Sequence, residues 1–464
     1  MTTQQNINLD WLTCRTGDPF ADVGGLVIKI LKEEKKNNDI MQLIKDTTDI
    51  YVNDWKAKLN AFFLNSTITQ PSYKGDRKTK ETIIFFQELL NEEISYEIGY
   101  CRIIGQKTKL FNGGRDNQIL SGSRKFINFH HAFQSGVLLS KEALIRMFFI
   151  PMGCVQLSDK VALLYSNNED LIEYFIAENI AENSRGAATK VTEGIHRSEF
   201  KSPSSALFDF ALRWIREAKR SNLENTELNL YHFTNFGASP KVVLHNFSVA
   251  LFTFYARVQH RTMKTDWNKF THSYFRQKKT EYKYETDTFE VTVKKEVQTL
   301  TYEEFKVWRN SIYESLIEGK SILRQMLNWV SKKGNPLNFE IVKLYQSILQ
   351  NMNEKTLQII ERLADYVLED SSNIKKNVFN LKRPEKAYEF RDALRQLEEK
   401  NLEEKKPETL FSLEEYALEL FPDGTYWREI QTLLLISIYQ KMHEQKIWLN
   451  DKEVSEETEE FNNS

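Results

Sequence analysis

Cysteine is scarce in this chain, whose 464 residues include only Cys14, Cys101 and Cys154. Because the three are odd in number and far apart, we expect free thiols in a reducing compartment, the cytoplasm, rather than a disulfide framework. Long apolar runs are lacking too: no stretch of about 18 uncharged apolar residues is present to span a membrane. The first residues lack the basic start and apolar centre of a secretory signal, so we expect no membrane association.

Metal-binding and catalytic motifs are also missing. The sequence contains no C-x-x-C, H-x-x-x-H or H-E-x-x-H pattern, the spacings that place ligands around one ion. His130 and His131 are adjacent, and neighbouring side chains on a strand point to opposite faces. No Ser-His-Asp or paired-carboxylate constellation stands out, although distant residues can meet in a fold. We therefore predict no metal and no cofactor.

The net charge of −2 conceals an uneven distribution. The last segment, 451–464, carries six acidic residues and one lysine, which predicts an acidic disordered tail. The rest of the chain is therefore slightly basic. A slightly basic chain neither requires nor excludes a nucleic-acid partner, so the evidence for one has to come from local segments.

Apolar periodicity predicts a chain of the α+β class. Three helical patterns come first, at 22–36, 40–64 and 79–91. From Ile98 to Phe133, β-branched and aromatic residues alternate with glycines, which is typical of strands and turns. The remaining expected elements are helices at 140–150, 169–182 and 205–221, and a hairpin near 281–298.

Beyond residue 302 the chain is predicted to be helical. Two apolar stripes at helical spacing support this: Ile341, Leu344, Tyr345 and Ile348, then Ala387, Phe390, Leu394 and Leu397. The last pattern, "WREIQTLLLISIYQKMH", is apolar nearly all round at its centre, so we expect it to be the buried helix. These patterns predict a C-terminal helical bundle.

The opening stretch "TGDPFADVGGLVI" (16–28) concentrates glycine, aspartate and proline before an apolar run. It matches neither the dinucleotide loop nor the Walker loop, because the glycine spacing is wrong and the Lys-Ser/Thr pair is missing. We expect Pro19 to fix a turn, Asp22 to cap the following helix, and Gly24 and Gly25 to allow close packing. The stretch is interpreted as a structural bend, with a ligand loop as the alternative.

A glycine-rich segment, "NGGRDNQILSGSRKFIN" (112–128), carries side chains that read base edges in DNA. The alternative is an ordinary polar hairpin. The candidate motif-reading residues are Arg115, Asn117, Gln118, Arg124, Lys125 and Asn128.

A second segment, 257–279, holds seven Lys/Arg against one acid and includes Trp267, Phe270, Tyr274 and Phe275. Cations for phosphates and rings for bases are what a single-stranded nucleic-acid path requires. The alternative is an amphipathic helix whose aromatics face the core. With the basic loop 69–80, the candidate backbone contacts are Lys74, Arg77, Lys78, Arg257, Arg261, Lys264, Lys269, Arg276, Lys278 and Lys279.

Three segments together resemble the large subunit of type I-B CRISPR surveillance complexes (Cascade). The first is the opening stretch, similar to a T-G-x-P-x-x-D-x-G start. The second is 119–166, where "GSRKFINF" leads through a helix to "PMGC" and "LLYSN". The third is "LFPDGTYWREIQTLLLISIYQKMH" near the C-terminus. They cover about a fifth of the chain, and their order and spacing make the resemblance more specific than any one motif.

The resemblance implies a non-catalytic subunit with a defined set of partners. Such a subunit would contact the guide RNA near its 5′ end, sense the protospacer-adjacent motif in target double-stranded DNA, help to open the duplex and hold the displaced strand. It would contact the backbone and guide-end subunits and recruit the helicase-nuclease. Its C-terminal helices would resemble the small subunit, which can be made separately from an internal start.

The implied domains are 1–325, an α+β domain, 326–450, a helical bundle resembling the small subunit, and the tail 451–464. The family often carries two cysteine pairs of a zinc ribbon around the second segment. Here only Cys101 stands near the first pair, and Val137 to Lys141 offer no second one. The resemblance therefore implies a degenerate zinc-ribbon-like β region without metal.

Two other classes of function stay open at the level of sequence. One is a metal-dependent nuclease with an unrecognised active site, whose DNA cleavage a chelator would abolish. The other is a stand-alone RNA-binding or helical scaffold protein. Genes for guide processing and a helicase-nuclease beside a repeat array would favour the surveillance subunit over both.

Overall fold

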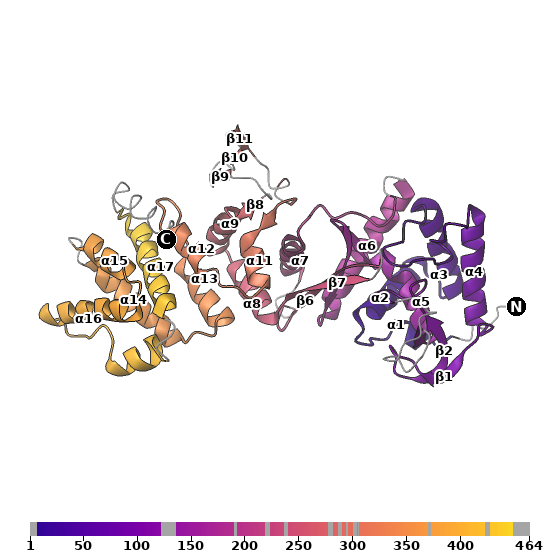
Figure 1. Cartoon of the computed structure of the whole chain (residues 1–464), viewed down its shortest axis with the longest axis horizontal. Coiled ribbons are helices and arrows are strands. Elements are labelled where there is room, and N and C mark those ends of the chain that lie inside the picture. Colours follow the sequence, from indigo (N-terminus) through magenta and orange to yellow (C-terminus); the bar gives the residue numbers. More distant parts are fainter. Residues whose placement is uncertain are drawn as a thin grey trace. The chain divides into compact units, whose positions relative to one another are not determined.

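The structure is a computed structural model of the chain, and it combines helices with small antiparallel sheets, which confirms the α+β class. It divides into two compact units, Met1–Ser248 with Tyr302–Arg309, and Val249–Thr301 with Asn310–Ser464. Figure 1 labels their elements along the chain. The residues that the structure describes are 7–121, 136–189, 193–218, 223–235, 240–276, 282–285, 290–293, 296–299, 304, 306–369, 373–422 and 427–448.

The first unit contains most of the strands. Its helices are α1 (Leu9–Thr13), α2 (Pro19–Lys35), α3 (Ile40–Asp49), η1 (Ile50–Asp54), α4 (Asp76–Leu90), α5 (Lys141–Phe149), η3 (Ile150–Gly153), α6 (Glu169–Thr189) and α7 (Pro203–Glu217). Its strands are β1 (Glu97–Tyr100), β2 (Lys107–Gly113), β3 (Val137–Leu139), β4 (Val155–Leu157), β5 (Lys160–Ser166), β6 (Leu228–Thr234) and β7 (Lys241–Phe247).

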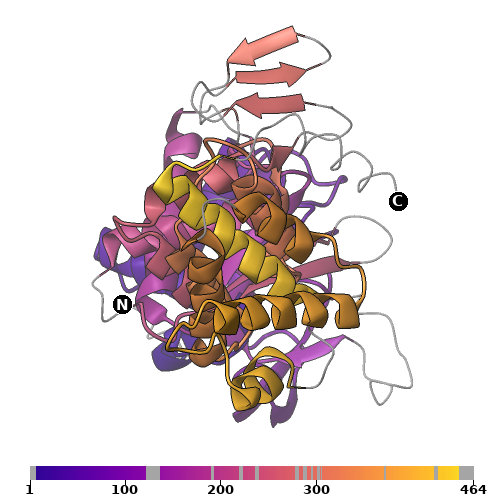
Figure 2. The ribbon, with the colours of Figure 1, turned by 90° about the vertical axis from the view of Figure 1, so that its left-hand side faces the viewer.

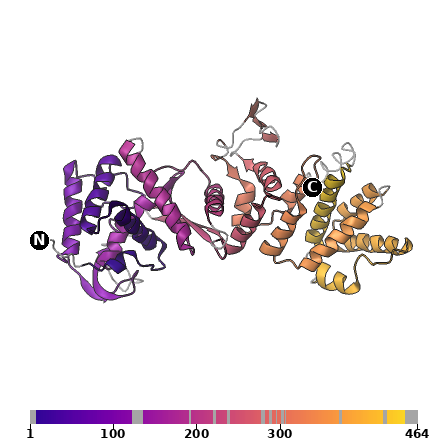
Figure 3. The same ribbon diagram turned by 180° about the vertical axis from the view of Figure 1, so that it is seen from behind.

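Two antiparallel sheets organise this unit, one of order β1-β2-β3 and one of order β4-β5-β6-β7. In the larger sheet, Leu163 lies opposite Tyr231, and Leu230 lies opposite His245. Buried residues of α2, α3, α4, α5 and α6 form the core together with those of the strands, and α2 packs against both α5 and η3. Figure 3 shows these helices from behind, in indigo and magenta.

The predicted helix over 40–64 is shorter than its apolar pattern. The regular helix ends in the π-turn η1, and Lys56 and Ala57 then adopt left-handed conformations with φ of 49° and 57°. Left-handed backbone is unfavourable for L residues and cannot continue a right-handed helix. Trp55 is nevertheless fully buried. The apolar pattern over 40–64 therefore reflects buried side chains on a helix and the turns that follow it, and not one continuous helix.

The start of α2 corrects one prediction. Asp18, not Asp22, caps the helix, because its carboxylate accepts the Ala21 N–H at 2.8 Å while Pro19 occupies the first turn. Asp22 lies inside the helix and is only 5 % exposed. Its carboxylate accepts hydrogen bonds from the Thr16 hydroxyl at 2.7 Å and the Tyr165 hydroxyl at 2.9 Å. Asp22 therefore ties the opening stretch to β5.

A buried arginine completes this cluster. Arg146 on α5 is fully buried, and its Nη2 donates to the Cys14 carbonyl at 2.5 Å. Its Nη1 lies 3.6 Å from Asp22 Oδ1. Burial lowers the pKa of Arg146 from its ordinary value, while Cys14 and Asp22 oppose that shift. A charge this deep needs such partners, since breaking a buried pair typically costs about 3–5 kcal/mol.

The two glycines of α2 allow α5 to approach, as predicted. A Cβ on Gly24 would lie 2.1 Å from the Arg146 carbonyl oxygen, and one on Gly25 would lie 3.1 Å from the Leu12 carbonyl oxygen. Both distances are below ordinary van der Waals contact. The opening stretch is therefore a packing element, and no phosphate or metal is needed to explain its glycines.

The second unit is predominantly helical, and its described strands belong to a three-stranded sheet, β11-β10-β9, and a two-stranded sheet, β12-β8. Its helices are α8 (Val249–Val258), α9 (Lys264–His272), α11 (Ser311–Ile317), α12 (Leu323–Val330), α13 (Phe339–Leu344), η5 (Tyr345–Leu349), α14 (Glu354–Glu369), α15 (Ile374–Lys382), α16 (Ala387–Glu403), η6 (Glu415–Leu420) and α17 (Trp427–Gln445). Its strands are β8 (Phe275–Arg276), β9 (Tyr282–Glu285), β10 (Glu290–Val293) and β11 (Glu296–Thr299), and β12 (Arg309–Asn310) lies at its boundary.

The predicted hairpin near 281–298 gains a third strand, because β9, β10 and β11 form an antiparallel sheet. Figure 2 shows the three arrows side by side. The tail 451–464 lies outside the described residues, so its predicted disorder stays a prediction. In the part of the chain that the structure covers, no helix is both long and apolar enough to cross a membrane.

Helix α17 is the buried helix, as its sequence predicts. Every residue from Leu433 to Gln440 is buried, and α12, α13, α14, α15 and α16 all contact it. Figure 2 shows α17 in yellow among these helices. In the predicted apolar stripe of α16, Phe390, Leu394 and Leu397 are also buried.

The stripe at 341–348 is shifted by the π-turn η5. Ile341, Val342, Tyr345 and Gln346 are buried, whereas Ile348 is only half-buried. A π-turn contains one residue more than an α-helical turn, so the buried face moves by about one position. The predicted boundary at residue 326 falls inside α12, where Met326 is fully buried.

Candidate nucleic-acid interface

The loop after β2 is a tight turn that uses one of the predicted motif-reading side chains. Asn117 Oδ1 accepts the Gly114 N–H at 2.8 Å, and the Asn117 N–H donates to the Gly114 carbonyl at 2.9 Å. The Asn117 amide nitrogen also reaches the Asn112 carbonyl, at 3.5 Å. Asn117 therefore stabilises the turn, which leaves one amide hydrogen and one lone pair of Oδ1 to contact a base.

Arg115 and Gln118 lie on the same turn. Arg115 is half-buried, and its carbonyl accepts the Leu64 N–H at 2.7 Å, which fixes the loop to the segment before α4. Gln118 Oε1 is buried and has no hydrogen-bond partner among the described residues. The structure thus brings three predicted residues together, while Arg124, Lys125 and Asn128 lie outside the described residues.

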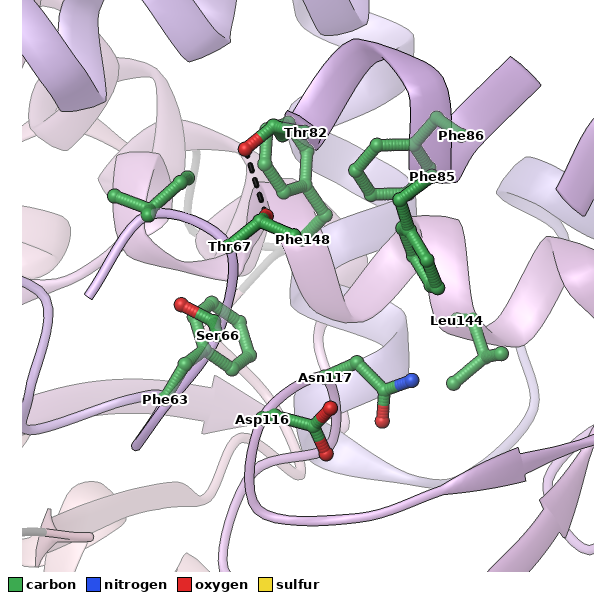
Figure 4. Close-up of a pocket in the computed structure, with 11 residues that line it drawn as sticks. Phe63, Ser66, Thr67, Thr82, Phe85, Phe86, Asp116, Asn117, Leu144 and Phe148 are labelled. Atoms are coloured by element: carbon green, nitrogen blue, oxygen red, sulfur yellow. Dashed lines mark hydrogen bonds between the residues drawn. The ribbon is translucent and has the colours of Figure 1, made fainter. Parts of the chain in front are cut away.

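A pocket of about 60 Å³ lies beside this loop. Figure 4 shows its aromatic wall and, opposite, Asp116 and Asn117 from the loop. The Thr67 and Thr82 hydroxyls lie 2.7 Å apart at its rim. Since an engineered cavity that holds benzene measures about 150 Å³, this space is too small for a nucleobase. We assign no ligand to it.

The basic loop 69–80 contributes fewer available cations than its sequence suggests. Lys74 is exposed, whereas Arg77 pairs with Glu81 at 3.2 Å and lies over the Tyr73 ring at 4.2 Å. Lys78 donates to the carbonyls of Ile68 and Gln70, and burial lowers its pKa. Lys78 therefore holds the loop together, and its contact with a phosphate would require this arrangement to open.

Burial in the segment 257–276 decides between the two interpretations of its aromatic residues. Trp267 and Phe270 are fully buried, and Phe275 is 5 % exposed. Trp267 packs edge-on against Phe254 with ring centroids 5.3 Å apart. The rings of α9 thus face the core, and they are not placed to stack on bases.

The cations of this segment nevertheless lie at the surface. Arg257, Arg261, Lys269 and Arg276 are exposed, and Lys264 is half-buried. Arg276 Nη1 donates to the Ser273 carbonyl at 2.7 Å, so this guanidinium is partly held by its own turn. Lys278 and Lys279 lie outside the described residues. Phosphate contact by these cations stays a prediction, and it would be contact by charge alone.

Outside this segment, the most exposed aromatic ring among the described residues is on β1. Tyr100 is 68 % exposed and Ile98 is 71 % exposed, with Tyr96 just before the strand. Sequence reasoning missed them, although the period-2 order in "YEIGY" (96–100) was the available signal. Alternation of this kind places every second side chain on one face of a strand.

The cysteines do not converge on a metal site. Cys14 is exposed, while Cys101 and Cys154 are buried, and burial raises the pKa of Cys154. Cys101 Sγ accepts the Ser140 N–H at 3.3 Å, a structural contact. Within the described ranges, no group of three or more His, Cys, Asp or Glu side chains is arranged to hold an ion.

Comparison with known proteins gives a match to a family model. Residues 328–464, under a third of the chain, match the family model described as the DevT C-terminal domain. No curated protein and no solved structure matches the chain significantly.

Proposed function

We propose that this chain is the non-catalytic large subunit of a CRISPR RNA-guided DNA surveillance complex. It acts in the cytoplasm and binds the guide RNA and target double-stranded DNA. It recognises the protospacer-adjacent motif, helps to unwind the duplex and stabilises the displaced strand. Its protein partners are the backbone and guide-end subunits, the small subunit and the helicase-nuclease.

The observation that carries the proposal is a set of contacts between two of the segments that resemble the large-subunit family. Asp22 in the opening stretch accepts the Tyr165 hydroxyl of "LLYSN", and Gly24 lies against Arg146 of the helix between "GSRKFINF" and "PMGC". A Cβ on Gly153 of "PMGC" would lie 2.9 Å from Val23. Motifs far apart in sequence that interlock in space support a common fold signature rather than chance similarity.

The finer features of the proposed fold follow the same resemblance. We propose that the sheet β1-β2-β3, next to which Cys101 accepts the Ser140 N–H, corresponds to the degenerate zinc ribbon. We likewise propose that the helices that contact α17 correspond to the small-subunit-like bundle.

We assign base reading and phosphate contact to different side chains according to their exposure and their hydrogen bonds. Base pairing with the guide reads the target sequence, while the protein reads a short motif and the backbone, as in other guided effectors. In this proposal, Arg115, Gln118 and the amide nitrogen of Asn117 read base edges from the turn after β2, and Gln118 does so by turning outward, because its Oε1 is buried. The exposed cations Arg257, Arg261 and Lys269 supply phosphate contacts, which give affinity without sequence information.

The motif-reading turn predicts a difference between two DNA substrates. We expect Arg115→Ala with Gln118→Ala to weaken binding of a motif-bearing duplex by about 1–3 kcal/mol for each base edge that is no longer read. A pre-opened bubble of the same sequence should lose far less affinity, because its recognition no longer depends on the motif. The measurement is a titration of the guide-loaded complex with both substrates.

Asn117→Asp is the comparison variant, since it keeps an oxygen that accepts the Gly114 N–H while it removes the amide donor and its contact with the Asn112 carbonyl; the negative charge that it adds acts on both substrates. Its effect on the duplex, relative to the bubble, isolates reading by that nitrogen from loss of the turn. Equal losses of affinity on duplex and bubble for all of these variants would reject a motif-reading role for the loop.

A further inference from the structure

Strands β1 and β2 form a hairpin whose outer face carries alternating rings and lysines. In its register, Ile98 lies opposite Lys109, and Tyr100 lies opposite Lys107. Residues directly opposite in an antiparallel pair share a face, so these four side chains point the same way. Tyr96 joins them, because Lys109 Nζ lies 4.6 Å from its ring centroid. We call this set of five residues the hairpin face.

The opposite side of the hairpin belongs to the core. Leu110 and Cys101 are each 2 % exposed, and a Cβ on Gly99 would lie 3.0 Å from Leu110 Cδ1. An antiparallel sheet with one face on the core normally presents polar side chains on the other. The hairpin face instead presents two tyrosines and an isoleucine, and Figures 1 and 3 show the hairpin at the margin of its unit.

The face is more exposed on β1 than at Tyr96, which precedes the strand. Tyr96 is 41 % exposed and is partly covered by Lys109 and by Phe111, whose ring centroid is 6.1 Å away. Tyr100 and Ile98 are far more exposed, at 68 % and 71 %. β1 is also the edge strand of its sheet. An apolar edge of this kind is a liability for a chain in isolation, which indicates that something covers it in use.

The charged side chains beside the rings of the hairpin face indicate what kind of ligand would fit there. Lys107 is exposed and has no ion-pair partner among the described residues, whereas Lys109 is held by Glu92. Between Tyr96 and Gln118 the sequence has four Lys/Arg and two acids. Cations beside exposed rings complement a chain of phosphates and bases, which is the composition of a single-strand binding surface.

The spacing of the side chains favours an extended strand over a duplex. Neighbours on one face of a strand are about 6.8 Å apart, so Tyr96 and Tyr100, which are separated on this face by Ile98, are roughly 14 Å apart, about four times the 3.4 Å rise per nucleotide of a stacked strand. Rings at this spacing fit bases that have been unstacked from one another. The paired and stacked bases inside a duplex offer no faces to them.

We infer that the hairpin face binds single-stranded nucleic acid, with Tyr100 stacking on a base and Lys107 contacting a phosphate. The aromatic ring provides sequence-tolerant affinity, and the lysine provides salt-dependent affinity. The shared chemistry of this ligand is a phosphodiester strand with unpaired bases. The inference concerns the chain by itself and therefore stands or falls separately from its membership of a guided complex.

The test uses the full-length chain and two fluorescein-labelled strands of about 12 nucleotides, oligo(dT) and oligo(U), a length within the usual site size of such surfaces. Tyr100→Ala is expected to weaken binding by roughly 5- to 100-fold, the effect of removing one ring from a stack with a base. Tyr100→Phe keeps the ring and should stay within about twofold of the parent, because stacking needs the ring and not the hydroxyl. Lys107→Gln should reduce the slope of log K against log salt by about 0.7, the value for one phosphate of a single strand.

The control is Tyr388→Ala, which removes a 65 % exposed tyrosine beside Lys386 on α16. It is expected to leave both affinities unchanged. Loss of either strand's binding in Tyr100→Ala, with retention in Tyr100→Phe, supports the inference, and the strand affected identifies DNA or RNA as the source. Absence of binding to both strands, or equal affinity of Tyr100→Ala and the parent, overturns it. Self-association that Tyr100→Ala abolishes, without strand binding, would also overturn it and assign the face to a second copy.

Discussion

Gly24→Ala is expected to lower the free energy of unfolding of the first unit by about 3 kcal/mol or more. Helix propensity alone predicts that the substitution raises the free energy of unfolding, because alanine is favoured over glycine inside a helix by about 1 kcal/mol. The added Cβ, however, would lie 2.1 Å from the Arg146 carbonyl oxygen and 2.7 Å from its carbon. These are backbone atoms, so relief requires α2 and α5 to separate, and overpacking of this kind typically costs about 1–3 kcal/mol and occasionally more.

The effect is measured by urea unfolding of the full-length chain, with the transition of the first unit followed separately from that of the second. Glu33→Ala is the matched control, since Glu33 is exposed on the same helix and its replacement should change stability by less than about 0.5 kcal/mol. An unchanged or raised midpoint for Gly24→Ala would show that the close approach of α2 and α5 does not determine the stability of this unit.

Met326→Leu is expected to abolish a separately made C-terminal product without loss of the full-length chain. Under the proposed function, a small subunit starts at or near Met326, folds alone and joins the complex beside the full-length chain. Met326 is fully buried in α12, and a Met-to-Leu exchange in a core usually costs less than about 1.5 kcal/mol. The variant therefore removes the start codon and keeps the fold.

Mass spectrometry of the complex purified from an untagged operon is the measurement. A start at Met352 would delete α12 and α13, both of which contact α17, so we do not expect that product. Ile430→Ala tests folding of the fragment, since Ile430 is 2 % exposed on α17 and such truncations cost about 2–5 kcal/mol. A parent without any short product, or a short product that persists in Met326→Leu, contradicts the proposed start.

The sequence predicts the fold well where burial and local pattern agree. The run Leu433–Gln440 identifies α17 as buried because an all-round apolar helix has only the core as a suitable environment. The glycines of the opening stretch are a second case, because only a missing side chain permits such close packing. The predicted helix cap in the same stretch is wrong. Asp18 and Asp22 both precede the apolar run, and only the fold shows that Asp22 contacts Tyr165 and Arg146 instead of capping the helix.

The candidate site is less predictable, because exposure is a tertiary property. Composition alone does not separate Trp267 and Phe270, which face the core, from rings that face solvent. The exposed ring of Tyr100 lies in a short strand with few charges, where no basic cluster marks it. Lys78 and Asn117 look like available donors in the sequence, but both are used by nearby backbone groups, which a sequence does not reveal.

Whether this chain is a guided DNA-binding subunit is decided by one experiment, the binding of a motif-bearing duplex with and without the chain. The complex is assembled with guide RNA in parallel with Mg²⁺ and with a chelator, and binding and integrity of the labelled duplex are measured together. The proposed function predicts tight binding only when the chain, the guide and the motif are all present, with the DNA left intact. Metal-dependent cleavage by the chain alone, or target binding that is equally strong when the chain is omitted, would contradict it.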